Sequence, residues 1–145
     1  MSSERNNSSR FKTILIENEE EAKKEFFTIR IIDFGISGKL KKGEMFKLNV
    51  GTPLYISPEV INHEYNEKCD MWSCGVIMYM MLSGQAPFKG DTEEELFQTI
   101  TKGKFNFDNE KWDEILNDEK DLINKLLQKN INKRFSSKEA LNHIC

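Results

Sequence analysis

The sequence predicts an α+β fold that is mostly α-helical and carries a small β-hairpin near its N-terminal end. The hairpin is expected from two segments, Thr13–Glu17 and Phe26–Ile32, joined by the charged segment Asn18–Glu25. Apolar and polar residues alternate in the second segment, as they do in a half-buried strand. The helical part is expected from Cys69–Ser83, where apolar residues occur nearly all round a helix, and from later segments with helix-capping residues. A helix that is apolar on every side has to lie at the centre of its domain.

Length and composition agree with one small domain. The 145 residues are 38% hydrophobic and include 10 Phe and 2 Trp, which is enough to form a core. The net charge of −3 comes from interspersed acids and bases, so binding to nucleic acid by charge alone is excluded. The N-terminus lacks the apolar core of a secretory signal, and the longest apolar run, Val76–Leu82, is far too short to span a membrane.

The cysteines and histidines form no metal-binding pattern. Cys69, Cys74 and Cys145 include no C-x-x-C pair, and His63 and His143 stand alone. This spacing argues against a zinc site and favours a reduced, intracellular and cytoplasmic setting.

Capping residues mark the expected helix boundaries. The central helix would be capped by Asn66 and would end at Gly84. The sequence Thr92-Glu93-Glu94-Glu95 has the capping-box pattern and would open the next helix. The segment Asp121–Gln128 is amphipathic, and Ser136 would cap a last short helix.

The segment Ile29–Glu59 is the most informative part of the chain. It contains Asp33-Phe34-Gly35 and, after a lysine-rich loop, the sequence GTPLYISPE that ends at Glu59. From about Thr13 to its end, the chain resembles a eukaryotic serine/threonine protein kinase. The motif Asp33-Phe34-Gly35 matches the family's magnesium-binding motif, and Ser57-Pro58-Glu59 stands where the family has Ala-Pro-Glu. The final stretch, LLQKNINKRFSSKEALNHIC, resembles the end of calcium/calmodulin-dependent and calcium-dependent kinase domains. The resemblance implies a partial kinase domain, the C-terminal lobe, over residues 13–145, with residues 1–12 disordered or foreign to it.

The resemblance also implies roles for individual residues. Asp33 would bind magnesium and thereby ATP, since magnesium takes hard oxygen ligands. Thr52 stands where serine/threonine kinases keep a hydroxyl that touches the catalytic Asp and Lys. Glu59 would form a buried, structural ion pair with Arg134, and Asp70 would hold the catalytic-loop backbone, although it could equally be an ordinary acid in the first turn of a helix. The other residues implied for the activation segment and substrate loop are Phe34, Gly35, Gly51, Pro53, Tyr55 and Pro58.

The family's catalytic residues are missing from their expected positions. When the sequences are aligned without gaps from Ile14, the catalytic Asp falls on Ser8 and the metal-binding Asn falls on Thr13. A Ser hydroxyl cannot accept a proton at neutral pH as a carboxylate does. Either the first dozen residues are foreign to the domain, as at a wrongly assigned exon boundary, or the chain is truly degenerate. The return of family-like spacing at Ile14 favours the first interpretation.

Two further expectations concern the loop and the central helix. The loop Ile36–Val50 has one hydroxyl residue, Ser37, close to its start, so we expect that phosphorylation of its own residues does not switch it. The resemblance implies that the kinase helices that would cover Cys69–Ser83 are absent, so we expect an exposed apolar patch and poor solubility of the isolated chain.

Three functions are compatible with these observations. The first is a magnesium- and ATP-dependent kinase acting on Ser and Thr of proteins, of which this chain is a part that is inactive alone. The second is a non-catalytic, pseudokinase-like C-lobe that binds substrates or regulators around Glu93–Glu95, and the third is a non-functional gene remnant. The intact Asp33 and Gly51–Glu59 favour the kinase for the parent protein. The expected partners are a protein substrate and either the missing N-terminal lobe or a regulator, but neither nucleic acid nor a membrane.

Overall fold

The computed structural model describes residues 14–16, 29–32, 38, 45 and 51–144, and the chain divides into two units, residues 1–39 and 40–145. The first unit contains two antiparallel strands, β1 (Ile14–Ile16) and β2 (Ile29–Ile31), in which Ile14 lies opposite Ile31 and Ile16 opposite Ile29. Each strand has 3 residues and is therefore shorter than the segment predicted for it. Most of the remaining residues of those segments lie outside the described part.

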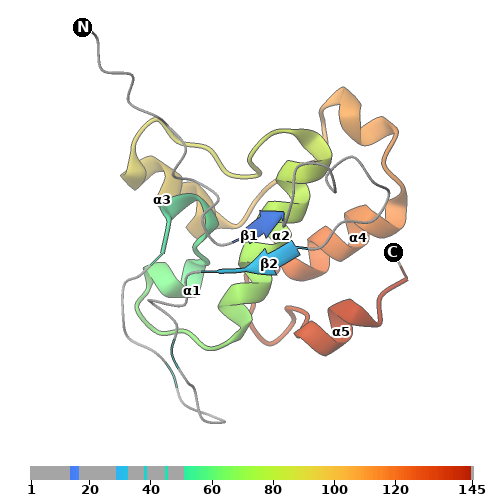
Figure 1. The fold of residues 1–145 in the computed structure, drawn as a ribbon. Helices are drawn as coiled ribbons and strands as arrows, with labels where there is room; N and C mark the ends of the chain where they lie inside the picture. Colours follow the sequence, from blue (N-terminus) through green and yellow to red (C-terminus); the bar gives the residue numbers. More distant parts are fainter. Residues whose placement is uncertain (1–13, 17–28, 33–37, 39–44, 46–50, 145) are drawn as a thin grey trace, which may run out of the picture. The chain divides into compact units, whose positions relative to one another are not determined.

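The second unit is helical, as Figure 1 shows. Its helices, in chain order, are the 3₁₀ helix Pro53–Tyr55, α1 (Pro58–Ile61), α2 (Lys68–Ser83), α3 (Glu93–Lys102), the 3₁₀ helix Glu110–Asp113, α4 (Asn117–Leu126) and α5 (Ser137–Leu141). The prediction of a mostly helical fold is confirmed. No helix in the described residues is both long enough and apolar enough to cross a membrane.

Helix α2 lies at the centre of this unit and packs against α4. Its residues Trp72, Val76 and Tyr79 are buried in the main core, and Trp72 stacks on Phe88 with ring centroids 5.3 Å apart. The two helices approach closely at Gly75, where a Cβ atom would lie 2.9 Å from the Cβ of Leu126. Only glycine fits this position, so the α2–α4 contact depends on a residue without a side chain.

Local hydrogen bonds cap both ends of α2. The predicted start at Cys69 is wrong by one residue: the helix begins at Lys68, whose N–H donates to the side-chain oxygen of Asn66 at 3.0 Å. Asn66 thus satisfies one of the free N–H groups of the first turn, but from two residues before the helix rather than from the N-cap position. The helix ends as predicted at Gly84, whose N–H donates to the carbonyl of Met80 at 2.8 Å.

The predicted start of the next helix is confirmed, because Thr92 is the N-cap of α3, but its capping box and the start of α4 differ from the prediction. The capping box at Thr92 is only half formed, because Thr92 accepts from the N–H of Glu95 at 3.2 Å while the Glu95 carboxylate accepts from the N–H of Asp91. The helix predicted for Asp121–Gln128 is instead α4, Asn117–Leu126. Its first turn is too polar to show the apolar spacing on which the prediction depended.

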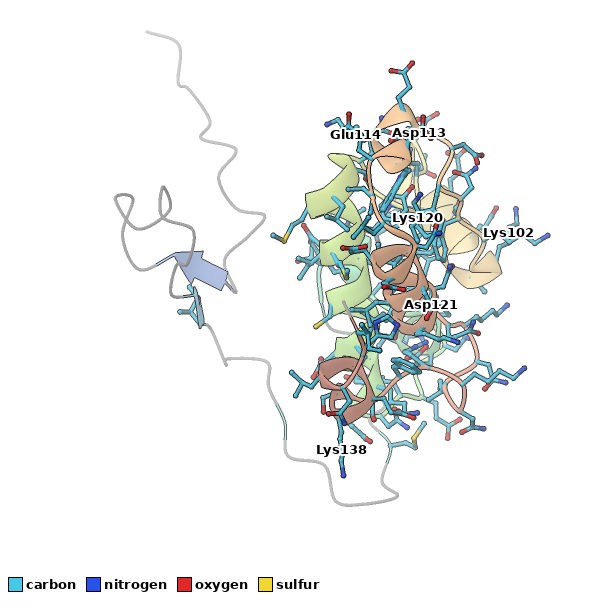
Figure 2. The ribbon with its side chains drawn as sticks, turned by 90° about the vertical axis from the view of Figure 1, so that its right-hand side faces the viewer. Lys102, Asp113, Glu114, Lys120, Asp121 and Lys138 are labelled. Atoms are coloured by element: carbon cyan, nitrogen blue, oxygen red, sulfur yellow. The ribbon has the colours of Figure 1, made fainter. Side chains whose placement is uncertain are left out.

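One side of α2 faces outward. Asp70, Cys74 and Met81 recur at helical spacing and are all exposed, and the Met81 side chain is 75% exposed. Elsewhere the surface of this unit carries mixed charges, among them Lys102, Asp121 and Lys138, which project outward in Figure 2. Whether Met81 belongs to an apolar patch that limits solubility stays a prediction.

Candidate functional site

The substrate loop, defined as residues Gly51–Pro58, begins with a backbone conformation that requires glycine. Gly51 has φ +123°, and a Cβ atom there would lie 2.8 Å from Cγ2 of Ile56. The next residue, Thr52, is exposed, and its carbonyl accepts from the N–H of Tyr55 at 2.9 Å to close the 3₁₀ helix. Within the described residues, the side chain of Thr52 makes no capping hydrogen bond.

The second half of the substrate loop is fixed to the helical unit. Ser73 in α2 donates from its hydroxyl to the carbonyl of Tyr55 at 2.8 Å, while Pro53 and Tyr55 are half-buried. Ile56, Ser57 and Pro58 are all buried, and Ile56 packs with Val60 and Tyr65 in a small second core. The loop is therefore held at its C-terminal end and exposed at its N-terminal end.

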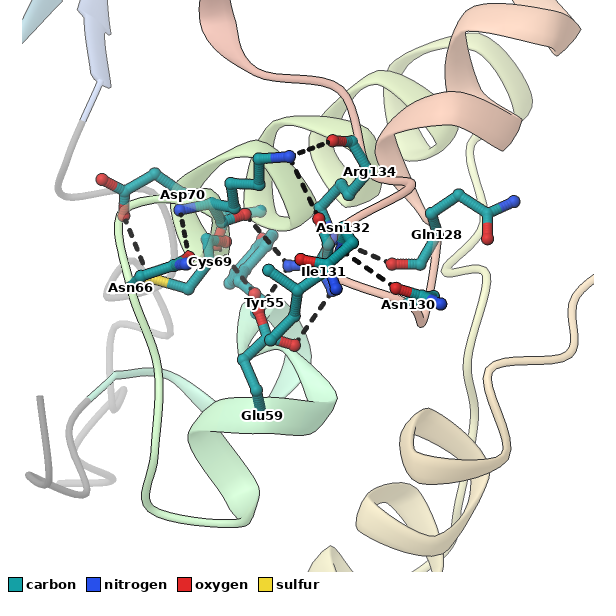
Figure 3. A network of polar contacts seen from close by, with 12 residues as sticks. Tyr55, Glu59, Asn66, Cys69, Asp70, Gln128, Asn130, Ile131, Asn132 and Arg134 are labelled. Atoms are coloured by element: carbon teal, nitrogen blue, oxygen red, sulfur yellow. Dashed lines mark hydrogen bonds and ion pairs between the residues drawn. The ribbon is translucent and has the colours of Figure 1, made fainter. Parts of the chain in front are cut away.

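A buried ion pair lies directly after the substrate loop. Glu59 in α1 is 7% exposed and Arg134 is 1% exposed, and the two are 75 residues apart in the chain. The pair is bidentate: one guanidinium nitrogen donates to each carboxylate oxygen, with 2.9 Å between Nη2 and Oε2 (Figure 3). Two charges can be buried in this way because the geometry lets each satisfy the other.

Two further N–H groups of Arg134 donate to main-chain carbonyls. Its Nε donates to the carbonyl of Gln128 at 2.9 Å, and Nη1 donates to the carbonyl of Lys68 at 3.0 Å. The guanidinium carbon lies 5.1 Å from the ring centroid of Trp72, in a cation–π contact. Arg134 thus connects α1, the start of α2 and the segment after α4.

Sequence reasoning missed Lys68. Its ammonium group donates to the carbonyls of Ile131, at 3.1 Å, and Arg134, at 2.7 Å. Those carbonyls belong to a turn in which Asn130 accepts from the N–H groups of Lys133 and Arg134, both at 3.0 Å. The Asn-Ile-Asn sequence signals such a turn, but no sequence signal points from the turn to Lys68.

Asp70 lies in the first turn of α2 and is exposed. The thiol of Cys69 donates to its carboxylate at 3.7 Å. Burial, followed by the negative charges of Asp70 and Glu59, raises the pKa of Cys69 to about 12. The thiol is therefore protonated at neutral pH and is unsuited to act as a nucleophile.

The candidate metal and catalytic positions Ser8, Thr13, Asp33, Phe34 and Gly35 lie outside the described residues. Within the described residues, no group of three or more His, Cys, Asp or Glu side chains could hold a metal ion. Two surface hollows, of about 510 Å³ and 440 Å³, are lined by residues near the C-terminus and by the turns at 83–85 and 108–111. None of the residues predicted to be functional lines either hollow.

Comparison with known proteins identifies the family. The family profile described as "Protein kinase domain" matches residues 11–144. The chain is 44% identical over 115 residues to calcium-dependent protein kinase 25 of Arabidopsis thaliana, which covers 79% of this chain and 22% of that protein. It is 42% identical over 124 residues to calcium-dependent protein kinase 4 of Plasmodium falciparum, which covers 86% of this chain and 24% of that protein.

The match therefore extends over most of this chain but over less than a quarter of each of these relatives. A third relative, calcium-dependent protein kinase 1 of rice (Oryza sativa subsp. japonica), is 40% identical over 84% of this chain. These matches confirm the resemblance inferred from the motifs around Asp33 and Glu59. The chain belongs to the protein kinase family and is similar to the calcium-dependent serine/threonine kinases within it.

Proposed function

We propose that this chain is part of an ATP-dependent kinase that phosphorylates Ser and Thr residues of proteins. The single observation that supports this best is the substrate loop, which ends at the buried Glu59–Arg134 pair and presents the exposed residue Thr52. Phosphoryl transfer depends almost entirely on positioning and charge stabilisation, so a loop whose C-terminal half is held in place is what the chemistry needs.

Asp33 would bind the magnesium ion that accompanies ATP. Magnesium keeps several waters and takes one or two carboxylates together with phosphate oxygens, so a single Asp fits this role. The ion would neutralise charge on the transferred phosphoryl group. Phe34 would anchor the segment by burial, and Gly35 would let its backbone turn.

The chain alone is not expected to catalyse the reaction. Ser8 and Thr13 stand at the positions of the catalytic carboxylate and of the second metal ligand, and neither supplies that chemistry. We therefore assign the activity to a longer protein or to a complex that contains this chain. The relatives are named as calcium-dependent kinases, so calcium dependence of the whole protein is part of the proposal. We expect that protein in the cytoplasm.

The test compares the native-length protein, isolated from its own cells, with the purified chain. Each is assayed for phosphate transfer from Mg-ATP to a Ser/Thr peptide library, with and without calcium. We expect transfer by the native-length protein, a loss of at least about 100-fold in Asp33→Asn, and no transfer by the chain alone. An inactive native-length protein, or full activity in Asp33→Asn, would contradict the proposal.

A non-catalytic binding module is the second candidate, and two observations favour it. The first is Ser8 at the catalytic position. The second is that Glu93, Glu94 and Glu95 are all exposed at the start of α3, where they could meet a basic protein segment. Fluorescence anisotropy with a defined Lys/Arg-rich peptide tests it. Saturable binding by the chain without ATP, weakened by substituting Gln for all three Glu residues, would support this candidate over the first.

A further inference from the structure

We propose that Lys68 is a positioning residue that fixes Arg134 and, through Glu59, the substrate loop. The naming of residues 51–58 as a substrate loop depends on the function proposed above. The physical claim, that Lys68 controls the order of these residues, depends only on the contacts described next.

Lys68 and Arg134 hold one another reciprocally. The Lys68 ammonium donates to the carbonyl of Arg134 at 2.7 Å, and the Arg134 guanidinium donates to the carbonyl of Lys68 at 3.0 Å. A second bond, from the ammonium to the carbonyl of Ile131 at 3.1 Å, extends the contact to the preceding residues of the turn. The side chain of each residue thus fixes the backbone of the other, as Figure 3 shows around Arg134.

The role of Lys68 is geometric. Among the described residues it forms no ion pair with a carboxylate, although its charge helps to lower the pKa of Glu139, and both hydrogen bonds of its ammonium go to main-chain carbonyls. A bidentate Arg–carboxylate pair needs its two groups to lie in one plane. A shift of the Arg134 backbone by about 1 Å would therefore be enough to break one of its two hydrogen bonds to Glu59. Without the ammonium, two carbonyls of the turn lose a charged donor, and Arg134 is held only by its N–H bond to Asn130 and by its side chain.

The effect reaches the loop through α1. Glu59 follows Pro58 directly, and both lie in the four-residue helix α1, which is too short to stay ordered without tertiary contacts. When Glu59 is no longer held by Arg134, the substrate loop keeps the Ser73–Tyr55 hydrogen bond, the packing of Tyr55 on the main core and the small core around Ile56, but loses its charged anchor. We therefore expect local loosening of residues 51–63, not a general loss of structure.

Hydrogen exchange measured by mass spectrometry tests this on the full chain, comparing wild type with Lys68→Met, Lys68→Arg and Lys133→Met. Lys133 is the matched control, because it is exposed in the same turn and its side chain makes no hydrogen bond or ion pair among the described residues. We expect Lys68→Met to speed exchange of residues 51–63 by about 10-fold or more, with exchange in the core of α4 unchanged. Lys68→Arg should restore much of the protection, because a guanidinium can donate to both carbonyls.

Three outcomes would overturn the proposal: no change in Lys68→Met, an equal increase in every helix, or the same local increase in Lys133→Met. Should Lys68→Met fail to fold, Lys68→Gln, which keeps a donor amide, is measured against the same criteria. In an active native-length protein, Lys68→Met should also raise KM for the peptide several-fold and leave KM for ATP unchanged. A wild-type protein without kinase activity would contradict the proposed function, whereas the exchange pattern would still decide the role of Lys68.

Discussion

Removing Arg134 is the sharpest test of the structure. In Arg134→Met, the Glu59 carboxylate stays buried at 7% exposure but loses both of its hydrogen bonds to the guanidinium. An unpaired buried charge of this kind costs about 3–5 kcal/mol, which is a large part of the ~5–15 kcal/mol that stabilises a typical domain. At about 4 °C per kcal/mol, the melting temperature should fall by about 12 °C or more.

A double variant separates the unpaired charge from the loss of packing. In Glu59→Leu combined with Arg134→Met, no charge is left buried, and two apolar side chains take the place of the pair. The carbonyls of Gln128 and Lys68 still lose their donor, which costs some stability. Because no charge is left unpaired, we expect the free energy of unfolding of the double variant to lie within about 2 kcal/mol of the wild-type value. Its stability should therefore exceed that of Arg134→Met alone, although it carries one more substitution.

Urea unfolding followed by Trp fluorescence measures these differences, because Trp72 and Trp112 are both fully buried. Lys125→Met is the control: Lys125 pairs with Asp121 at 3.9 Å and lies 5.9 Å from the centroid of the Phe135 ring, the Lys125 and Asp121 side chains are 43% and 50% exposed, and the loss of the charge should cost about 1 kcal/mol or less. Two results would refute the reasoning. One is a cost below about 1 kcal/mol for Arg134→Met, and the other is a double variant whose cost equals the sum of the two single costs.

Three further predictions use the same unfolding assay. Ser57→Ala should stabilise the protein by about 1 kcal/mol, because the Ser57 hydroxyl is fully buried and has no hydrogen-bond partner among the residues that the structure describes; a loss of stability would mean that the hydroxyl has a partner. Gly51→Ala should cost about 1–3 kcal/mol, since φ is +123° and the added Cβ would crowd Ile56; a neutral result would show that the loop can relax. The pKa of Cys69 is raised in the folded state. The stabilisation that the protonated thiol gives to the folded state is therefore complete at pH values below the ordinary thiol pKa of 9.0 and is lost as pH rises towards about 12. The free energy of unfolding should therefore fall less steeply over this range in Cys69→Ala than in wild type, and equal slopes would contradict the assignment.

The sequence predicted the parts of this fold that depend on residue type and local spacing. The apolar composition of Cys69–Ser83 identified the central helix, and Gly84 marked its end. The family motifs led us to expect Glu59 and Arg134 to be paired, which no local pattern could suggest, because 75 residues separate them. The start of α4 at Asn117 was missed, since its first turn is polar and leaves no apolar spacing to detect.

The missed contacts share one physical property: a main-chain group forms one side of each. Every residue carries a carbonyl, so nothing in the sequence marks those of Ile131 and Arg134 as partners of Lys68. The same holds for Glu95, whose carboxylate accepts from the N–H of Asp91 and not from that of Thr92, the N-cap residue that a complete capping box would use.

Hydrogen bonds to main-chain carbonyls also explain how Lys68, Arg134 and Glu59 hold three segments of the chain together. Lys68 and Arg134 lie 66 residues apart and join the start of α2 to the turn after α4, while Glu59 joins both to α1. Four of the hydrogen bonds in this network end on main-chain carbonyls, so they do not depend on the side chains of Gln128 or Ile131. Substitution at either of those two positions should therefore be tolerated better than any change at Lys68, Arg134 or Glu59, because these three provide the charged side-chain groups of the network.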